Sequence, residues 1–159
     1  MNSKYIIFLL IILNFSITFA QEDGLPGSKS TFKSSTNFQA LPLELKSKTA
    51  KFFNSLIDNK INVAYEDILK DTPLGKKTES VNDLKKQTTK LFELYGNIKS
   101  FDPVNYEMIG SSFVRLRYLG LHSRFPIRWI FTYYKSPDQG WIITNIKFDD
   151  LTDFYFEDN

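Results

Sequence analysis

Hydrophobic residues follow one spacing in the first half of the chain and another after Gly96. Before Gly96 they recur three and four positions apart, which is the repeat of an amphipathic helix. After Gly96 they alternate with polar residues, which is the repeat of a strand with one buried face. The pattern therefore predicts helices first and strands second, as in an α+β domain with an antiparallel sheet.

Three helices are predicted from the first pattern. Pro42 opens the first helix, which is expected to end near Asp58-Asn59, and a short second helix is expected over 63–69. The third helix is expected over 81–95, with Gly96 as its stop. The residues expected to face inward are Leu45, Phe52, Phe53, Leu56 and Ile57, then Val63, Ala64, Ile68 and Leu69, and then Leu84, Thr88, Leu91, Phe92 and Tyr95.

Four strands are predicted after Gly96, near 98–109, 113–121, 127–134 and 141–148. A bulge or a sheet edge is expected at Pro103, because proline cannot donate to a strand ladder. A two-residue turn at His122-Ser123 would pair Leu116 with Trp129. The face expected to form the core then carries Val114, Leu116 and Tyr118, Ile127, Trp129, Phe131 and Tyr133, and Ile142, Thr144, Ile146 and Phe148.

The arginines are clustered, since all four lie within 115–128, and lysine serves as the basic residue elsewhere. A guanidinium grips a carboxylate or phosphate with two hydrogen bonds, which lysine cannot do. The register places them on the sheet face away from the core, which gives a predicted binding surface of Arg115, Arg117, Arg128, Tyr134 and Trp141. Arg117 would lie opposite Arg128. The alternative is that these arginines are solvated or pair with the acidic C-terminal segment.

The stretches Phe125 to Lys135, Gly140-Trp141 and Asn145 to Asp150 resemble bacterial secreted proteins of the nuclear transport factor 2-like superfamily. The order of helices and strands is similar to that superfamily over roughly Leu43 to Asp150. This resemblance implies three helices packed in a curved four-stranded antiparallel sheet, a cone-shaped, cystatin-like fold that is often a homodimer. Enzymes of the superfamily hold an acid or histidine base inside the cone, with a tyrosine or second acid nearby, and no such pair maps onto this chain.

The inner aromatic residues of the cone have two interpretations. Tyr118, Trp129, Phe131 and Tyr133 line a pocket if the helices leave the cone open, and they form the core if the helices fill it. The sequence alone leaves both open.

The N-terminus has the features of a secretory signal peptide over residues 1–20. Lys4 precedes the apolar run Tyr5 to Phe15, and Ala20 ends a small-x-small cleavage site. We therefore expect an exported protein, periplasmic or secreted, with no stable membrane span after cleavage. The alternative is an uncleaved anchor, which would favour a subunit of an envelope assembly. A flexible leader is expected over 21–42, rich in Ser, Thr and Gly.

Composition narrows the function classes. Removing residues 1–20 leaves 19 basic against 18 acidic side chains, a formal charge of +1, which argues against a nucleic-acid partner. The absence of cysteine excludes disulfides and a lipid-anchored form. With a single histidine, His122, and no repeated Asp-x-Asp spacing, neither a metal site nor a cofactor is predicted. His122 itself is expected to be exposed in a turn.

These observations predict one domain over 43–150, followed by an acidic and aromatic tail over 151–159. The favoured function is a non-enzymatic binding or interaction module. It would hold a small amphipathic molecule in the cone, or an acidic partner or second subunit at the arginine-bearing face. The alternative is a small isomerase- or hydrolase-like enzyme that uses an internal carboxylate.

Overall fold

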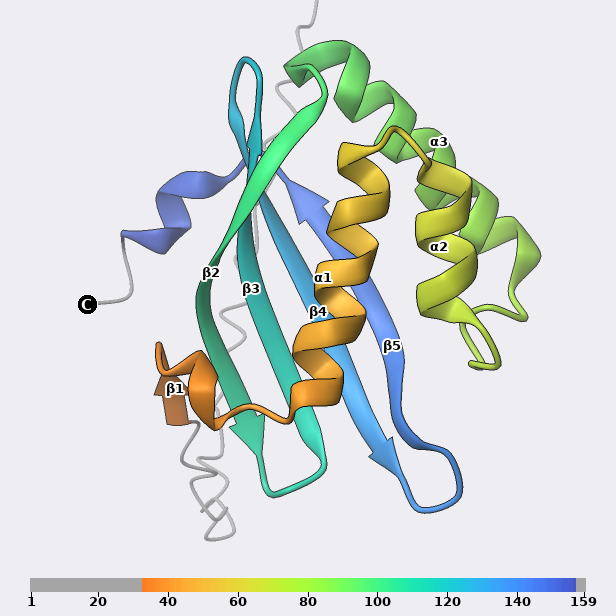
Figure 1. The fold of residues 1–159 in the computed structure, drawn as a ribbon, viewed down its shortest axis with the longest axis vertical. Coiled ribbons are helices and arrows are strands. Elements are labelled where there is room, and N and C mark those ends of the chain that lie inside the picture. Colours follow the sequence, from red (N-terminus) through yellow and green to blue (C-terminus); the bar gives the residue numbers. More distant parts are fainter. Residues whose placement is uncertain (1–32, 157–159) are drawn as a thin grey trace, which may run out of the picture.

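The computed structural model describes residues 33–156, so the predicted signal peptide lies outside the described residues (Figure 1). The elements are β1 (Lys33–Ser35), η1 (Phe38–Ala40), α1 (Leu43–Ile57), α2 (Ile61–Leu69), α3 (Thr78–Tyr95), β2 (Ile98–Ile109), β3 (Phe113–His122), β4 (Pro126–Ser136), β5 (Gly140–Asp149) and η2 (Thr152–Tyr155). Three helices precede four of the strands of the antiparallel sheet, which confirms the predicted α+β fold, and β1 is a fifth strand that the sequence pattern does not predict. The sheet is open.

The helices follow the predicted apolar spacing with small differences. α3 ends at Tyr95 and is capped by Gly96, where the backbone adopts φ 81° and the Gly96 N–H donates to the Phe92 carbonyl. Glycine suits this left-handed position because it has no Cβ. Ile57 and Val63, which were predicted to face inward, are exposed. The buried stripe is narrower than predicted at the end of α1 and the start of α2.

The sheet has the strand order β1-β2-β3-β4-β5. A register shift between Pro103 and Asn105 confirms the predicted irregularity in β2. The β3–β4 loop is longer than predicted, since Leu121 pairs with Pro126 and Leu116 pairs with Phe131. This pairing differs from the predicted one by two residues, so both strands keep their predicted faces. Arg117 and Arg128 therefore do not lie opposite each other.

The first half of β5 has the opposite orientation from the prediction. A register shift leaves Thr144 as an extra residue, so Tyr133 pairs with Ile143 rather than with Thr144. Such a bulge inverts which side chains face inward. Trp141 is consequently in the core, with 5% of its surface exposed, and its prediction as an outer-face binding residue is wrong. Ile142 and Thr144, which were predicted in the core, are not buried.

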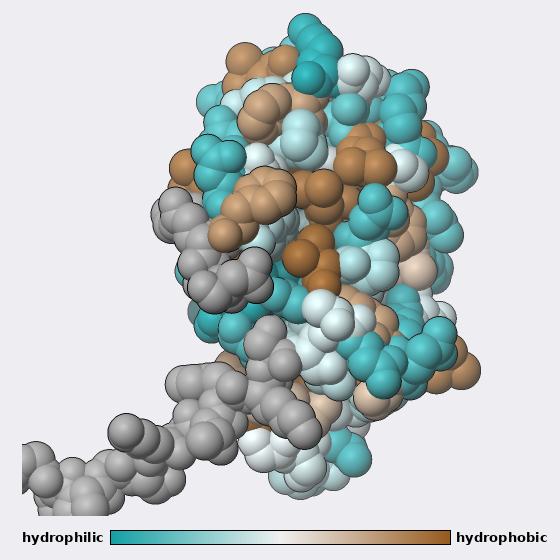
Figure 2. Space-filling model, turned by 90° about the vertical axis from the view of Figure 1, so that its left-hand side faces the viewer, coloured by the Kyte–Doolittle hydropathy of each residue, from teal (hydrophilic) through white to brown (hydrophobic). Residues whose placement is uncertain are grey.

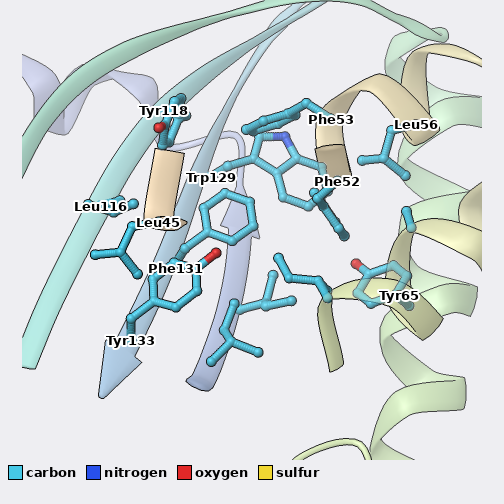
Figure 3. Close-up of a cluster of buried hydrophobic side chains, with 14 of the residues drawn as sticks. Leu45, Phe52, Phe53, Leu56, Tyr65, Leu116, Tyr118, Trp129, Phe131 and Tyr133 are labelled. Carbon is cyan, nitrogen blue, oxygen red and sulfur yellow. The ribbon is translucent and has the colours of Figure 1, made fainter. Parts of the chain in front are cut away.

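The helices fill the concave side of the sheet with aromatic side chains (Figure 3). Phe52 of α1 is at the centre, with ring centroids 5.2 to 5.8 Å from those of four neighbours. Those neighbours are Phe53, Tyr65, Trp129 and Phe131. The predicted pocket-lining residues Tyr118, Trp129, Phe131 and Tyr133 are all buried in this cluster. They are core residues, because α1 and α2 occupy the space that a ligand would need.

Two tyrosine hydroxyl groups in this core have hydrogen-bond partners. The Tyr65 hydroxyl lies 2.7 Å from Thr88 Oγ1, and the Tyr133 hydroxyl lies 2.9 Å from Thr49 Oγ1. Burial raises the pKa of both tyrosines, and of Tyr118 to about 12. These tyrosines are therefore neutral at physiological pH and serve packing.

The end of the predicted flexible leader is ordered. β1 pairs with β2, and Phe38 packs edge-on against Tyr106 and Tyr118. Leu41 is buried beside them. The leader prediction is thus wrong for residues 33–42, because the edge of β2 offers these residues both backbone partners and aromatic surface.

Candidate functional site: the outer sheet face

We use "outer sheet face" for the side of β2–β5 that points away from the helices. Strand pairing arranges its side chains in rows that cross the strands. One row contains Glu107, Arg115, Thr132 and Asn145, and the next contains Asn105, Arg117, Ile130 and Lys147. Three of the four arginines lie here, as predicted.

Two of these arginines share one carboxylate. Arg117 donates to Glu107 Oε1 at 2.8 Å and to Asn105 Oδ1 at 3.0 Å, and Arg115 Nη1 lies 3.5 Å from Glu107 Oε2. These four residues form two adjacent rows on β2 and β3, since Glu107 pairs with Arg115 and Asn105 pairs with Arg117. The strand register therefore places Glu107 where it offsets the repulsion between the two neighbouring guanidinium groups.

Arg128 forms a bidentate ion pair with Asp149. The Nε and Nη2 atoms donate to the two carboxylate oxygens, each at 2.9 Å. This hydrogen bonding raises the pKa of Arg128. The interpretation that the arginines pair with the C-terminal acids holds for this pair. Arg124, in the β3–β4 loop, donates instead to the Glu93 carbonyl at the end of α3.

The segment after β5 returns to the sheet through Tyr155. Its hydroxyl donates to the Tyr118 carbonyl at 3.0 Å. Pro103, the β2 partner of Tyr118, has no N–H with which to complete the ladder there. Burial raises the pKa of Tyr155, while the nearby charges of Arg128 and Arg117 lower it. η2 therefore covers the region of the outer sheet face around these two arginines.

An apolar row lies at the other end of the outer sheet face. Pairing joins Ile109 to Phe113, Phe113 to Tyr134, and Tyr134 to Ile142, one residue from each strand. We call these four residues the apolar row. Ile109 is 43% exposed and Tyr134 is 37% exposed, while the other two are half-buried. More generally, the surface in Figure 2 shows hydrophobic patches among hydrophilic side chains.

The sequence identified only Tyr134 of this row. The sequence pattern predicts Ile142 in the core, because it gives no sign of the bulge at Thr144. Ile109 and Phe113 lie on either side of the turn that begins at Gly110. An apolar residue at the end of one strand and at the start of the next is the sequence signal that predicts this pair.

His122 is buried, in contrast to the prediction. It is 9% exposed at the end of β3, where its Nδ1 lies 2.8 Å from the Gly96 carbonyl. Because a carbonyl only accepts, Nδ1 carries the hydrogen and Nε2 is an acceptor. Nε2 is buried and has no hydrogen-bond partner among the described residues. The ring packs edge-on against Phe92 of α3.

We expect His122 to make the protein less stable as the pH falls. Burial lowers the pKa of His122 below its ordinary value of about 6.5, so the unfolded state binds a proton more readily. The stabilisation from the neutral ring is complete above the unfolded pKa and is lost as the pH falls below it. Urea unfolding at about pH 7.5 and about pH 5.5 should show a decline in stability that is smaller in His122→Phe. An equal decline in both proteins would contradict the assignment.

Two features were sought among the described residues: a buried carboxylate and a cluster of metal ligands. None of the Asp and Glu side chains described in residues 33–156 is buried. Over the same range, no cluster of three or more His, Asp or Glu side chains is placed to hold a metal ion. None of the described helices has the length and hydrophobicity needed to cross a membrane.

Comparison with known proteins gives no relative for this chain: no family model, no curated protein and no solved structure matches it. The resemblance to the nuclear transport factor 2-like superfamily stays a prediction. The function is therefore argued from the site alone.

Proposed function

We propose that this chain is an exported, non-enzymatic interaction module that binds a second copy of itself through the outer sheet face. The observation that carries the proposal is the apolar row, which runs without interruption across β2, β3, β4 and β5. Burying such a row against a partner removes apolar surface from water and favours association.

The charges beside the apolar row favour an identical partner. Glu107 and Arg115 lie in the adjacent row and have opposite signs, and Arg115 keeps 49% of its side chain exposed. In a two-fold dimer each surface meets a copy of itself, so Arg115 of one copy can face Glu107 of the other. A surface that carries positive and negative charges beside the apolar row can therefore be complementary to a second copy of itself.

Other ligands have weaker support. The space inside the cone is filled by the aromatic core, so a small amphipathic ligand there would have to displace it. An acidic partner would have to displace Glu107 or Asp149 from the arginines. The enzyme alternative needs a buried acid, and the carboxylates of residues 33–156 are all at least partly exposed.

Replacing Ile109 by glutamate is expected to weaken self-association at least about tenfold, which corresponds to about 1.4 kcal/mol. The change puts a charge into the apolar row without touching the core. Sedimentation equilibrium over a concentration series measures it. Leu94→Glu is the matched control, because Leu94 is 66% exposed on α3, outside the outer sheet face, and this variant should associate like the wild type.

A charge exchange tests the two-fold arrangement. Arg115→Glu alone and Glu107→Arg alone should both be monomeric, because like charges then face each other across the axis. Mixing the two variants in equal amounts should restore association. A wild-type protein that stays monomeric at about millimolar concentration, well above the range of most specific dimers, would refute the proposal.

A further inference from the structure

α3 is the least buried of the three helices. Three of its 18 residues are buried, compared with five of 15 in α1 and four of nine in α2. It lies on the far side of α2 from α1, and its C-terminal end leads into β2 (Figure 1). An element with few buried residues opens at a lower free energy than the rest of a fold. The contacts at the end of α3 are therefore important for keeping it closed.

The end of α3 is joined by hydrogen bonds to the end of β3 and to the loop that follows it. Nδ1 of His122 donates to the Gly96 carbonyl at 2.8 Å. The backbone N–H of Arg124 donates to the Tyr95 carbonyl at 3.0 Å, and its guanidinium donates to the Glu93 carbonyl at 2.9 Å. We call these three hydrogen bonds the α3 end contacts. Two of them come from an exposed arginine, and the third comes from a buried histidine.

The surroundings of the His122 ring do not suit a second ring proton. Phe92 of α3 packs against the ring with centroids 5.5 Å apart, and Ile98 of β2 is the strand partner of His122. Gly120, two residues earlier on the same face of β3, has no side chain, and the Trp129 Nε1 next to it can only donate. Nε2 of His122 has no hydrogen-bond partner within the described part of the chain. A proton on Nε2 would therefore create a buried donor without an acceptor, which is unfavourable.

The charged side chains on the segments around His122 are all exposed. They are Lys90 and Glu93 of α3, Lys99 of β2, Arg124 of the β3–β4 loop and Asp150 after β5. Burial lowers the pKa of His122, the Gly96 carbonyl opposes part of this change, and none of these charges contributes to it. The ring is therefore neutral in the closed protein because it is buried, and it regains its ordinary pKa where water reaches it.

We propose that His122 is a pH-sensitive switch that releases the C-terminal end of α3 from the sheet. When Nε2 takes up a proton, the ring moves into water, and α3 loses both the His122 hydrogen bond and the contact with Phe92. Gly96 is the hinge, because a glycine can leave its φ of 81° for other backbone angles without a Cβ clash. β3 stays paired with β2 and β4. The open form exposes apolar surface of Phe92 and Ile98 at mildly acidic pH.

Amide hydrogen exchange measured by NMR first tests whether the opening is local. The amides of 91–96 should exchange through an opening that does not change with urea up to about 1 M, because a local opening exposes little surface. The amide of Phe131, on the internal strand β4, should lose protection as urea is added, because its exchange requires global unfolding. The same urea dependence for both would overturn the proposal. Ile109→Glu should behave like the wild type, so this test does not depend on the proposed dimer.

The same amides then report the effect of pH. Lowering the pH from about 7.5 to about 5.5 should reduce the protection factors of 91–96 several-fold, with an upper limit of about tenfold. The pKa of His122 is about 6.5 in the open form and lower in the closed form, so the open form binds the proton more readily. His122 is the only histidine in the sequence, so no other imidazole titrates in this range. His122→Phe should remove the pH dependence, and a change of less than about twofold in the wild type would overturn the proposal.

Arg124→Ala is the matched control. This change removes the bond to the Glu93 carbonyl but no group that titrates near neutral pH, so the protection of 91–96 should fall by the same factor at both pH values. A pH effect that disappears in Arg124→Ala, or that persists in His122→Phe, would assign the switch to another group and refute the proposal. If His122→Phe does not fold, His122→Gln replaces it, because glutamine does not titrate and can still donate to the Gly96 carbonyl.

Discussion

Replacing Phe52 by alanine is expected to lower the free energy of unfolding by about 3–5 kcal/mol, the largest effect of any single change considered for this protein. Phe52 is fully buried, and its ring contacts four aromatic neighbours from α1, α2 and β4. Its removal leaves a cavity at the point where these elements meet. The surrounding rings cannot close that cavity, because each is held by its own backbone.

Chemical denaturation monitored by circular dichroism measures the loss. Leu43→Ala is the control, because Leu43 is on the same helix but 76% exposed, and its truncation should cost no more than about 0.5 kcal/mol. If Phe52→Ala costs no more than this control, the aromatic cluster is not the centre of the core.

Replacing Gly120 by alanine is expected to cost about 2–3 kcal/mol, although only one methyl group is added. A Cβ at Gly120 would lie 2.8 Å from Nε1 and 2.9 Å from Cδ1 of Trp129, and 3.2 Å from Cδ1 of Ile98. Both neighbours are buried, and the Trp129 indole packs against Phe52, Phe53 and Phe148. The indole therefore has no free space into which it can move.

A double-mutant cycle separates this steric contact from the general effect of losing a glycine in a strand. Trp129→Leu removes the aromatic ring whose atoms lie nearest Gly120, so the cost of Gly120→Ala should fall by at least about 1 kcal/mol in that background. Thermal unfolding of the four proteins gives the coupling energy. Additive costs would show that the close approach of the indole does not determine the residue at position 120.

The sequence predicted those features that depend on spacing within one element. The three helices and four main strands lie within a few residues of their predicted bounds, because amphipathic periodicity and glycine or proline stops are local signals. The faces of β3 and β4 were also predicted, even though the loop length was wrong. An error of two residues in register leaves every side chain on its own face.

Features that depend on a single inserted residue could not be predicted. Thr144 lies in a strand sequence that is equally compatible with a regular strand and with a bulged one. The bulge nevertheless places Trp141 in the core and Ile142 outside it. Whether the cone is open or filled depends on how far α1 and α2 approach the sheet, which no sequence pattern reports. His122 is similar, since its burial depends on α3 packing against the end of β3.

The loop between β3 and β4 also determines when the helices can become stable during synthesis. It holds the end of α3, because the N–H groups of Arg124 and Ser123 donate to the carbonyls of Tyr95 and Asn97. The aromatic face of α1 likewise lacks part of its contacts until β4 supplies Trp129 and Phe131, although Tyr65 of α2 already packs against Phe52. A growing chain therefore leaves part of this aromatic surface exposed until β4 has been made, and we expect a fragment that ends at Gly96 to aggregate.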